Sequence, residues 1–184
     1  MRPGVKEIKK IWDWTRKDIE DLFKAFCIPL EKGVLGSGPT NAYAIYLFCM
    51  IDLWGSIFLS KFGERNTGQN VSHFLNLLNE KSPDLYRFEE GNLSNLADQL
   101  RNNLAHNYGL RVIKSNKIQE WLEINVNNVG PIIFTNDNGR IQIDCIRLKD
   151  HVLEIIEEWL KKIIILTNPQ KINPRSDVKP PIMI

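Results

Sequence analysis

The sequence is poor in the residues that bind metal ions or form disulfides. It has three cysteines and three histidines among 184 residues. Cys27, Cys49 and Cys145 lie far apart and form no CxxC pair, which argues against a disulfide framework and against a zinc site. The chain also has no HExxH sequence and no paired acidic cluster. We therefore expect reduced thiols, a cytoplasmic protein, and no metal or other cofactor.

A strong charge of either sign is also missing. The formal net charge is +2, which neither requires nor excludes nucleic acid, so any basic surface would have to be local. The glycines of residues 33–38 lack the Walker spacing, and no Gly-Lys-Ser/Thr follows them, so we do not expect a phosphate-binding loop. The first residues are charged and lack the apolar region of a secretory signal.

One stretch is apolar enough to raise the question of a membrane span. Ala42–Leu59 contains a single charge, Asp52, and borders on the length that crosses a bilayer. Asp52 and the pair Gly55-Ser56 interrupt it, and no aromatic or basic belt brackets both ends. We therefore expect a buried central helix and no membrane association. The buried carboxylate needs a partner, either a structural Arg, Lys or Trp N–H in the core, or a functional side chain of a neighbouring helix.

Hydrophobic periodicity predicts a mainly α protein. Most of the chain shows apolar residues at three- and four-residue steps with polar residues between them. Helices are expected at Lys6–Phe26, from Thr40 or Asn41 to about Phe62, at Asn70–Glu80, at Asn92–Gly109 and at Leu148–Leu166.

Between the last two of these helices the residue pattern is typical of β-strands. Strands are expected at Leu110–Ile113 and at Ile118–Val126, where a short helix is the alternative. Alternating residues in Pro131–Thr135 and Arg140–Cys145 flank Asn138-Gly139, a strong hairpin signal. We expect one domain over residues 1–166, an up-and-down helical bundle with a β-hairpin at about 131–145, and a Pro-rich flexible tail at 167–184.

The helix expected at Asn92–Gly109 carries the residues of greatest interest. Four leucines at three- and four-residue steps form its apolar stripe, and the opposite face is polar. That polar face holds Ser94, Asn95, Asp98, Arg101, Asn102 and His106. One interpretation is a solvated surface on which Arg101 pairs with Asp98 at i,i+3. The other is a site, because arginine binds phosphate in a bidentate manner and imidazole exchanges a proton near neutral pH.

The sequence RNNLAHNY, from Arg101 to Tyr108, resembles the signature of the HEPN superfamily, whose members are helical domains of prokaryotic toxins and RNA-processing proteins. The family pattern is Arg, four to six residues of which the first is commonly Asn, and then His. A toxin variant continues as His-x-Tyr, as His106-Asn107-Tyr108 does. The resemblance covers this helix closely and the helical layout loosely. The chain departs from the smallest members in its length and in its expected hairpin.

The resemblance implies a metal-independent endoribonuclease, of a toxin or defence type, or a relative that has lost catalysis. Cleavage through the 2′-hydroxyl needs a general base, a general acid and positive charge at the phosphate. One motif supplies a single histidine, so we expect a homodimer that brings two motif helices together. His106 of each protomer would be base or acid, Arg101 of both would hold the phosphate, and Asn102 would orient His106 or bind phosphate. Asp52 is a candidate to orient Arg101 or His106.

Tyr108 has two interpretations. It lies nearer the apolar stripe than His106, which favours a packing role. In toxins with the His-x-Tyr variant the tyrosine is adenylylated by a partner nucleotidyltransferase, which implies an antitoxin partner of that kind. Two other functions remain open on the sequence alone: a non-catalytic module that binds nucleotide, RNA or a protein, and a structural bundle in which the motif is coincidental.

Overall fold

We describe the protein from a computed structural model. The structure describes residues 4–27, 38–62, 66–87, 111–114, 117–120, 122–125, 130–135 and 141–167. The helix expected at 92–109 and the tail after Thr167 lie outside these residues, so both stay predictions.

Four long helices form most of the described structure. They are α1 (Val5–Leu22), α3 (Gly38–Phe58), α4 (Thr67–Lys81) and α6 (Cys145–Thr167), and α1 continues into a π-helical turn, η1 (Phe23–Cys27). All four were predicted from periodicity, with boundaries that differ by a few residues. The second helix ends earlier than expected, at Phe58, because Ser60 adopts a left-handed conformation with φ of 57°.

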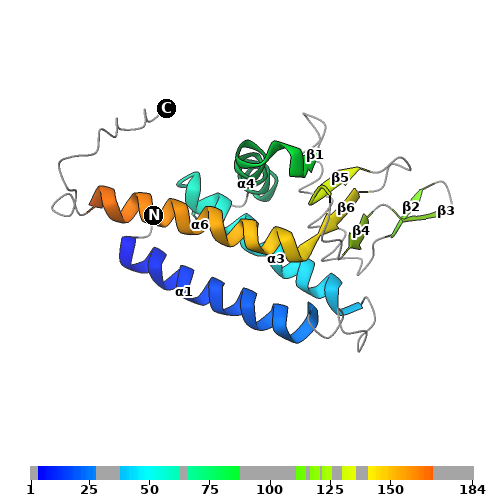
Figure 1. The fold of residues 1–184 in the computed structure, drawn as a ribbon, viewed down its shortest axis with the longest axis horizontal. Helices are drawn as coiled ribbons and strands as arrows, with labels where there is room; N and C mark the ends of the chain where they lie inside the picture. Colours follow the sequence, from blue (N-terminus) through cyan, green and yellow to red (C-terminus); the bar gives the residue numbers. More distant parts are fainter. Residues whose placement is uncertain are drawn as a thin grey trace.

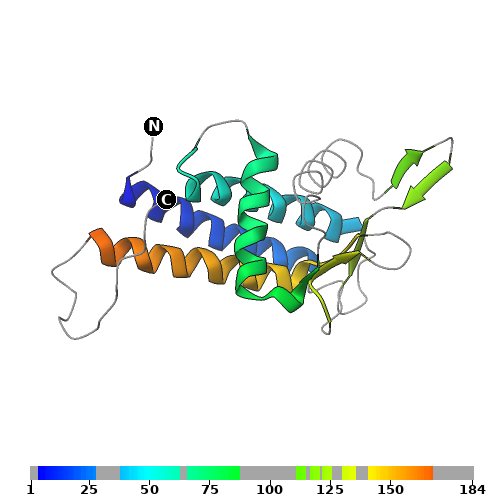
Figure 2. The same ribbon diagram turned by 90° about the horizontal axis from the view of Figure 1, so that it is seen from above.

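Three of these helices run along the length of the molecule and the fourth crosses them. In Figures 1 and 2, α1 runs toward the sheet, whereas α3 and α6 run away from it. Figure 2 shows α4 lying across their direction. The N-terminal end of α1 and the C-terminal end of α6 therefore lie together at the end of the molecule opposite the sheet.

The crossing of α3 and α4 depends on a glycine. A Cβ atom at Gly55 would stand 2.1 Å from the carbonyl oxygen of Asn70, well inside van der Waals contact. The absence of a side chain at this position thus allows the two helix backbones to touch. Three residues earlier on α3, Asp52 accepts a hydrogen bond of 2.8 Å from the side-chain amide of the buried Asn70.

The core is built around Trp54 of α3, whose side chain is fully buried. Its ring centroid lies 5.9 Å from that of Trp12 in α1 and 6.3 Å from that of Trp159 in α6, both in edge-on arrangements. The indole N–H of Trp54 donates to the hydroxyl of Thr15 at 3.3 Å. One residue thereby joins three helices, which is the central position predicted for the apolar second helix.

A small sheet packs at the start of α6. Its strand order is β1-β5-β6-β4, with bounds β1 (Tyr86–Arg87), β4 (Leu122–Asn125), β5 (Ile133–Thr135) and β6 (Ile141–Asp144). A 3-10 turn, η2 (Pro83–Leu85), leads from α4 into β1. A separate antiparallel pair consists of β2 (Arg111–Lys114) and β3 (Lys117–Glu120).

The antiparallel pairing of β5 with β6 confirms the predicted hairpin, in the register Ile133↔Ile143 and Thr135↔Ile141. The other two pairings of this sheet are parallel, β1 with β5 and β4 with β6. They were not predicted, because parallel neighbours are joined through long connections that leave no local turn signal. The mainly α fold with a small β insertion before the last helix is confirmed.

Two further predictions meet the structure here. No helix among the described residues combines the length and the apolar character needed to cross a membrane. The stretch that raised the question is α3, and seven of its hydrophobic side chains are buried in the core. Of the cysteines, Cys27 and Cys145 are buried, while Cys49 is exposed.

Candidate functional site

Most of the predicted site lies outside the described residues. Asp98, Arg101, Asn102, His106 and Tyr108 all fall between β1, which ends at residue 87, and β2, which begins at residue 111. Their roles therefore stay predictions from the sequence. The structure does describe the framework on both sides of this segment, and β1 leads directly into it.

Asp52 is the one predicted site residue that the structure describes. Its side chain is partly buried and its Oδ1 atom accepts the amide N–H of Asn70 at 2.8 Å. The expectation that this carboxylate has a structural partner is met, and the partner is an amide of α4, which the sequence did not suggest. The bond braces the α3–α4 crossing next to Gly55. Whether Asp52 also orients Arg101 or His106 stays a prediction, since both lie outside the described part of the chain.

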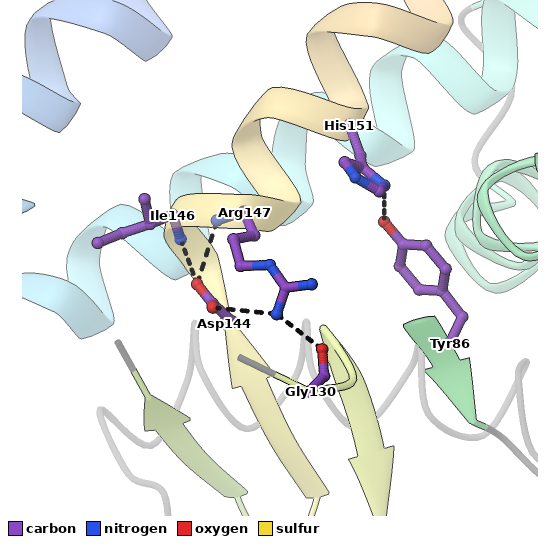
Figure 3. A network of polar contacts seen from close by, with 6 residues as sticks. All are labelled: Tyr86, Gly130, Asp144, Ile146, Arg147 and His151. Carbon is purple, nitrogen blue, oxygen red and sulfur yellow. Dashed lines mark hydrogen bonds and ion pairs between the residues drawn. The ribbon is translucent and has the colours of Figure 1, made fainter. Parts of the chain in front are cut away.

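The structure reveals a second group of polar contacts where the sheet meets α6, which we call the sheet–helix junction. It consists of the side chains of Tyr86, Asp144, Arg147 and His151 and the backbone carbonyl of Gly130 (Figure 3). The hydroxyl of Tyr86 lies 2.9 Å from Nδ1 of His151, and the two ring centroids are 5.9 Å apart. Tyr86 is almost fully buried and His151 is half-buried, so this contact joins β1 to α6 under the surface.

Asp144 begins α6 as its capping residue. Its Oδ1 atom accepts the backbone N–H groups of Ile146 and Arg147, each at 3.1 Å. These are two of the N–H groups that a helix leaves unsatisfied at its start. The other oxygen, Oδ2, is buried without a hydrogen bond from a described residue and lies 3.9 Å from the Arg147 guanidinium. The same guanidinium donates to the carbonyl of Gly130 at 2.7 Å (Figure 3).

Burial shifts the proton affinities of this junction. The pKa of His151 is lowered, first by burial of the ring and then by the positive charges of Arg147 and Lys81, against the pull of Glu154 and Asp150. Burial raises the pKa of the Asp144 carboxyl, against the hydrogen bonds and charge at Arg147. Burial also raises the pKa of the Tyr86 hydroxyl. At neutral pH, His151 is therefore a neutral imidazole beside a neutral phenol.

The residue types of this junction resemble those of a catalytic site, but its polar groups bind one another. Arg147 and His151 stand four residues apart on one face of α6, a spacing close to that of Arg101 and His106. The guanidinium is held by a carbonyl and a carboxylate, and the imidazole by a phenol. We assign the junction a structural role, which is to fix β1, and hence the start of the motif segment, against α6.

Sequence reasoning missed this junction. His151 is half-buried because it packs against Tyr86, which lies 65 positions away in the chain. The cap had a signal in the sequence, because Asp144 precedes an apolar helical pattern and Asp is a preferred capping residue. The contact between Tyr86 and His151 had none.

No group of three or more His, Cys, Asp or Glu side chains that could hold a metal ion occurs in the described ranges. Comparisons of the chain with family models, with curated proteins and with solved structures find no match.

Proposed function

We propose that the protein is a metal-independent endoribonuclease of the HEPN type, acting in the cytoplasm as a toxin or defence effector. The observation that carries this proposal is the sequence Arg101-Asn102-x3-His106-x-Tyr108 on an amphipathic helical pattern. The mainly α framework supports it, because such a motif requires a helical scaffold. The fold alone does not imply the activity, which rests on the motif.

The proposed reaction is an attack of the RNA 2′-hydroxyl on the adjacent phosphate. His106 of one protomer takes the proton of that hydroxyl, and His106 of the partner subunit protonates the leaving 5′-oxygen. Arg101 of both protomers holds the phosphate oxygens on which negative charge builds. Asn102 lies one helical turn before His106 and fixes its ring by a hydrogen bond, or donates to the phosphate directly.

Asp52 has a lesser part in this proposal. Its contact with Asn70 gives it a sufficient structural reason, so we assign the chemistry to the motif residues and treat Asp52 as a brace. Tyr108 is the candidate for modification by a partner nucleotidyltransferase, which would place a bulky, charged group two residues from His106 and block the site.

The first test is RNA cleavage by the purified protein in the presence of a chelator, compared with the variants His106→Ala and Arg101→Ala. We expect the wild-type protein to cut with the chelator present and both variants to lose at least about 100-fold in rate, since each removes a proton-transfer or charge-stabilising group. His73→Asn is the matched control, because it removes a histidine on α4 that lies outside both the motif and the sheet–helix junction. Cleavage by His106→Ala at the wild-type rate would disprove the assignment.

The second test asks whether the site is shared between protomers. Wild-type and His106→Ala chains are mixed, denatured and refolded so that subunits exchange at random. If catalysis needs both imidazoles, activity follows the square of the wild-type fraction, and an equal mixture retains about a quarter of it. A linear decline to about a half would mean that each protomer carries a complete site.

A further inference from the structure

The outer surface of α1 carries a set of lysines away from its core-facing side. The buried side of the helix is formed by Ile8, Trp12, Thr15 and Ile19. Lys6 and Lys10 project from the opposite side and Lys9 from its flank, at 100° per residue, and all three are exposed. They occupy the first half of the helix, at the end of the molecule that lies opposite the sheet (Figure 1).

The end of α6 adds one lysine to the same region. Arg16 of α1 pairs with Glu157 of α6 at 3.4 Å, which aligns the two antiparallel helices. Lys9 lies two turns before Arg16 on the same stripe of α1, and Lys161 lies one turn after Glu157 on the same stripe of α6. Their backbone positions therefore approach one another along the seam between the helices. Lys161 is exposed, whereas Lys162 lies one turn after Glu158, on the side of α6 where Glu158 pairs with Lys81 of α4.

These four lysines, Lys6, Lys9, Lys10 and Lys161, form what we call the lysine arc. None of them has an ion pair or a side-chain hydrogen bond with a residue that the structure describes. Of the neighbouring acids, Glu7 accepts the N–H of Gly4, Glu157 pairs with Arg16, and Glu154 and Glu158 pair with Lys81. The charges of Lys161 and Lys162 also help to lower the pKa of Glu158. Asp13 is the one other acid of α1 beside the arc.

An exposed tryptophan adjoins the arc. Trp14 is 67% exposed, the largest value among the exposed large hydrophobic residues of the described chain, whereas Trp12 and Trp54 are buried. It stands one helical turn after Lys10 on the same side of α1. An indole held in water next to exposed ammonium groups is the combination by which proteins contact single-stranded nucleic acid, with bases stacked on the ring and lysines beside the phosphates.

We propose that the lysine arc and Trp14 bind single-stranded RNA without sequence preference, as a surface separate from the motif. This deepens the proposed function, because it assigns the protein a region that holds the substrate beyond the cleavage point. The distance along α1 from Lys6 to Trp14 is about 12 Å, at 1.5 Å per residue, which matches two to three nucleotides of an extended strand. Lysines place positive charge without reading bases, so this contact is expected to be strongly salt-dependent.

The test measures binding, not cleavage. The His106→Ala chain is titrated against a fluorescent 12-nucleotide oligouridylate at 50 and 200 mM salt, with anisotropy as the readout. Adding Lys6→Gln, Lys9→Gln and Lys10→Gln together should weaken binding about 10- to 100-fold at 50 mM salt. It should also reduce the slope of log K against log salt by about 2, at about 0.7 per lost phosphate contact.

The matched control changes two lysines away from the arc and from Trp14. Lys24→Gln with Lys61→Gln removes one positive charge in η1 and one after α3, where Lys61 donates to Gln69. It should change affinity less than threefold, whereas Lys9→Gln with Lys10→Gln should lower it about tenfold. Equal losses for the two pairs would reduce the effect to net charge and overturn the proposal.

Trp14 gives an independent readout. RNA should quench the tryptophan fluorescence of the parent chain, and the Trp14→Phe variant should lose most of that quenching while it keeps affinity within a few-fold, because phenylalanine still stacks. Trp14→Ala should bind about tenfold more weakly. Circular dichroism checks that each variant is folded, which is expected because the side chains of the arc and Trp14 are exposed.

The outcomes separate this proposal from the ribonuclease. If the protein never cleaves RNA but binds it through the arc with these losses, the binding surface stands and the ribonuclease fails. If it cleaves RNA and the triple lysine variant binds as tightly as its parent, the surface is overturned and the ribonuclease stands. Exposed Ile164 and Ile165 adjoin the α6 lysines, so vesicles with 30% phosphatidylserine are a third arm. Lysine-dependent binding to vesicles but not to RNA would also overturn the proposal.

Discussion

The aromatic core and the sheet–helix junction hold the same helix, α6, by different physics. In the core, Trp159 of α6 packs against Trp54 and Phe58 of α3, with centroid distances of 6.3 and 4.8 Å. At the junction, the first turns of α6 are held by a phenol–imidazole contact and by a cap at Asp144. Apolar burial is non-directional and indifferent to pH, whereas the junction depends on direction and on protonation. The core should therefore supply most of the stability, and the junction should supply position.

The largest difference in stability between the two regions is expected when the central side chain of the core is removed. Trp54→Ala empties a fully buried site that touches three helices, and should lower the free energy of unfolding by about 4 kcal/mol. Urea unfolding followed by circular dichroism measures this. Trp14→Ala is the matched control, because that ring is exposed, and its effect should stay within about 0.5 kcal/mol. Similar losses for the two variants would contradict the placement of the core.

The next largest effect is expected where backbones touch. Gly55→Ala would place a methyl group 2.1 Å from the Asn70 carbonyl oxygen, so α3 and α4 must separate, at a cost of about 3 kcal/mol. This opposes the gain of up to about 1 kcal/mol that alanine normally brings inside a helix. Gly4→Ala is the control, since its nearest neighbour is the flexible Glu7 side chain. A more stable Gly55→Ala protein would show that the close crossing is absent in solution.

The two regions also differ in how far the sequence predicts them. The four described helices and the pairing of β5 with β6 follow from local signals in the sequence, namely the 3.6-residue period and the dipeptide Asn138-Gly139, so they were found. The burial of Trp54 follows from the apolar character of its helix on all sides. The junction is different, because Tyr86 meets His151 only after the chain has folded. No sequence pattern near either residue indicates this contact.

The candidate site shows the same limit. Arg101 and His106 were found as a pattern of residue types, which needs no structure. The contact of Asp52 with Asn70 was not found, because Asn70 is an ordinary amide on a different helix and is brought close only by the crossing at Gly55. Whether two motif helices meet across a dimer axis depends on how the two protomer surfaces fit together. The periodicity of a single helix does not predict that fit.

A smaller and more local effect is expected at the junction. Tyr86→Phe removes the hydroxyl that contacts His151 at 2.9 Å but keeps the buried ring, and should lower the free energy of unfolding by about 1 kcal/mol. Tyr46→Phe is the control, because that hydroxyl contacts Asp18 at 3.3 Å at the surface, and its loss should be smaller. Hydrogen exchange should then show faster opening at β1 than in α3. An equal increase in the exchange rates of β1 and α3 would contradict the distinction between core and junction.

The smallest effect is the one that titration should reveal. The pKa values of His151 and of His73 are both lowered, mainly by burial, with the charges of Arg147 and Lys81 adding at His151 and Glu80 opposing at His73. The unfolded chain, with an ordinary histidine pKa of 6.5, then binds more protons than the folded chain as pH falls below that value. Stability should therefore be full above pH 6.5 and should decline as pH falls toward the folded pKa values.

A pair of variants assigns this decline to one region. His151→Asn places an amide oxygen near the position of Nδ1, where it accepts the Tyr86 hydroxyl but does not titrate. His73→Asn likewise removes a titrating side chain, in α4. Urea midpoints measured at pH 5.0 and 7.5 should differ less in either variant than in the wild-type protein, and least in the double variant. Trp54→Phe, a change in the core, should leave the pH difference as it was. An unchanged pH difference in the double histidine variant would mean that acid sensitivity arises outside these two groups, and the junction would then be no more sensitive to protonation than the core.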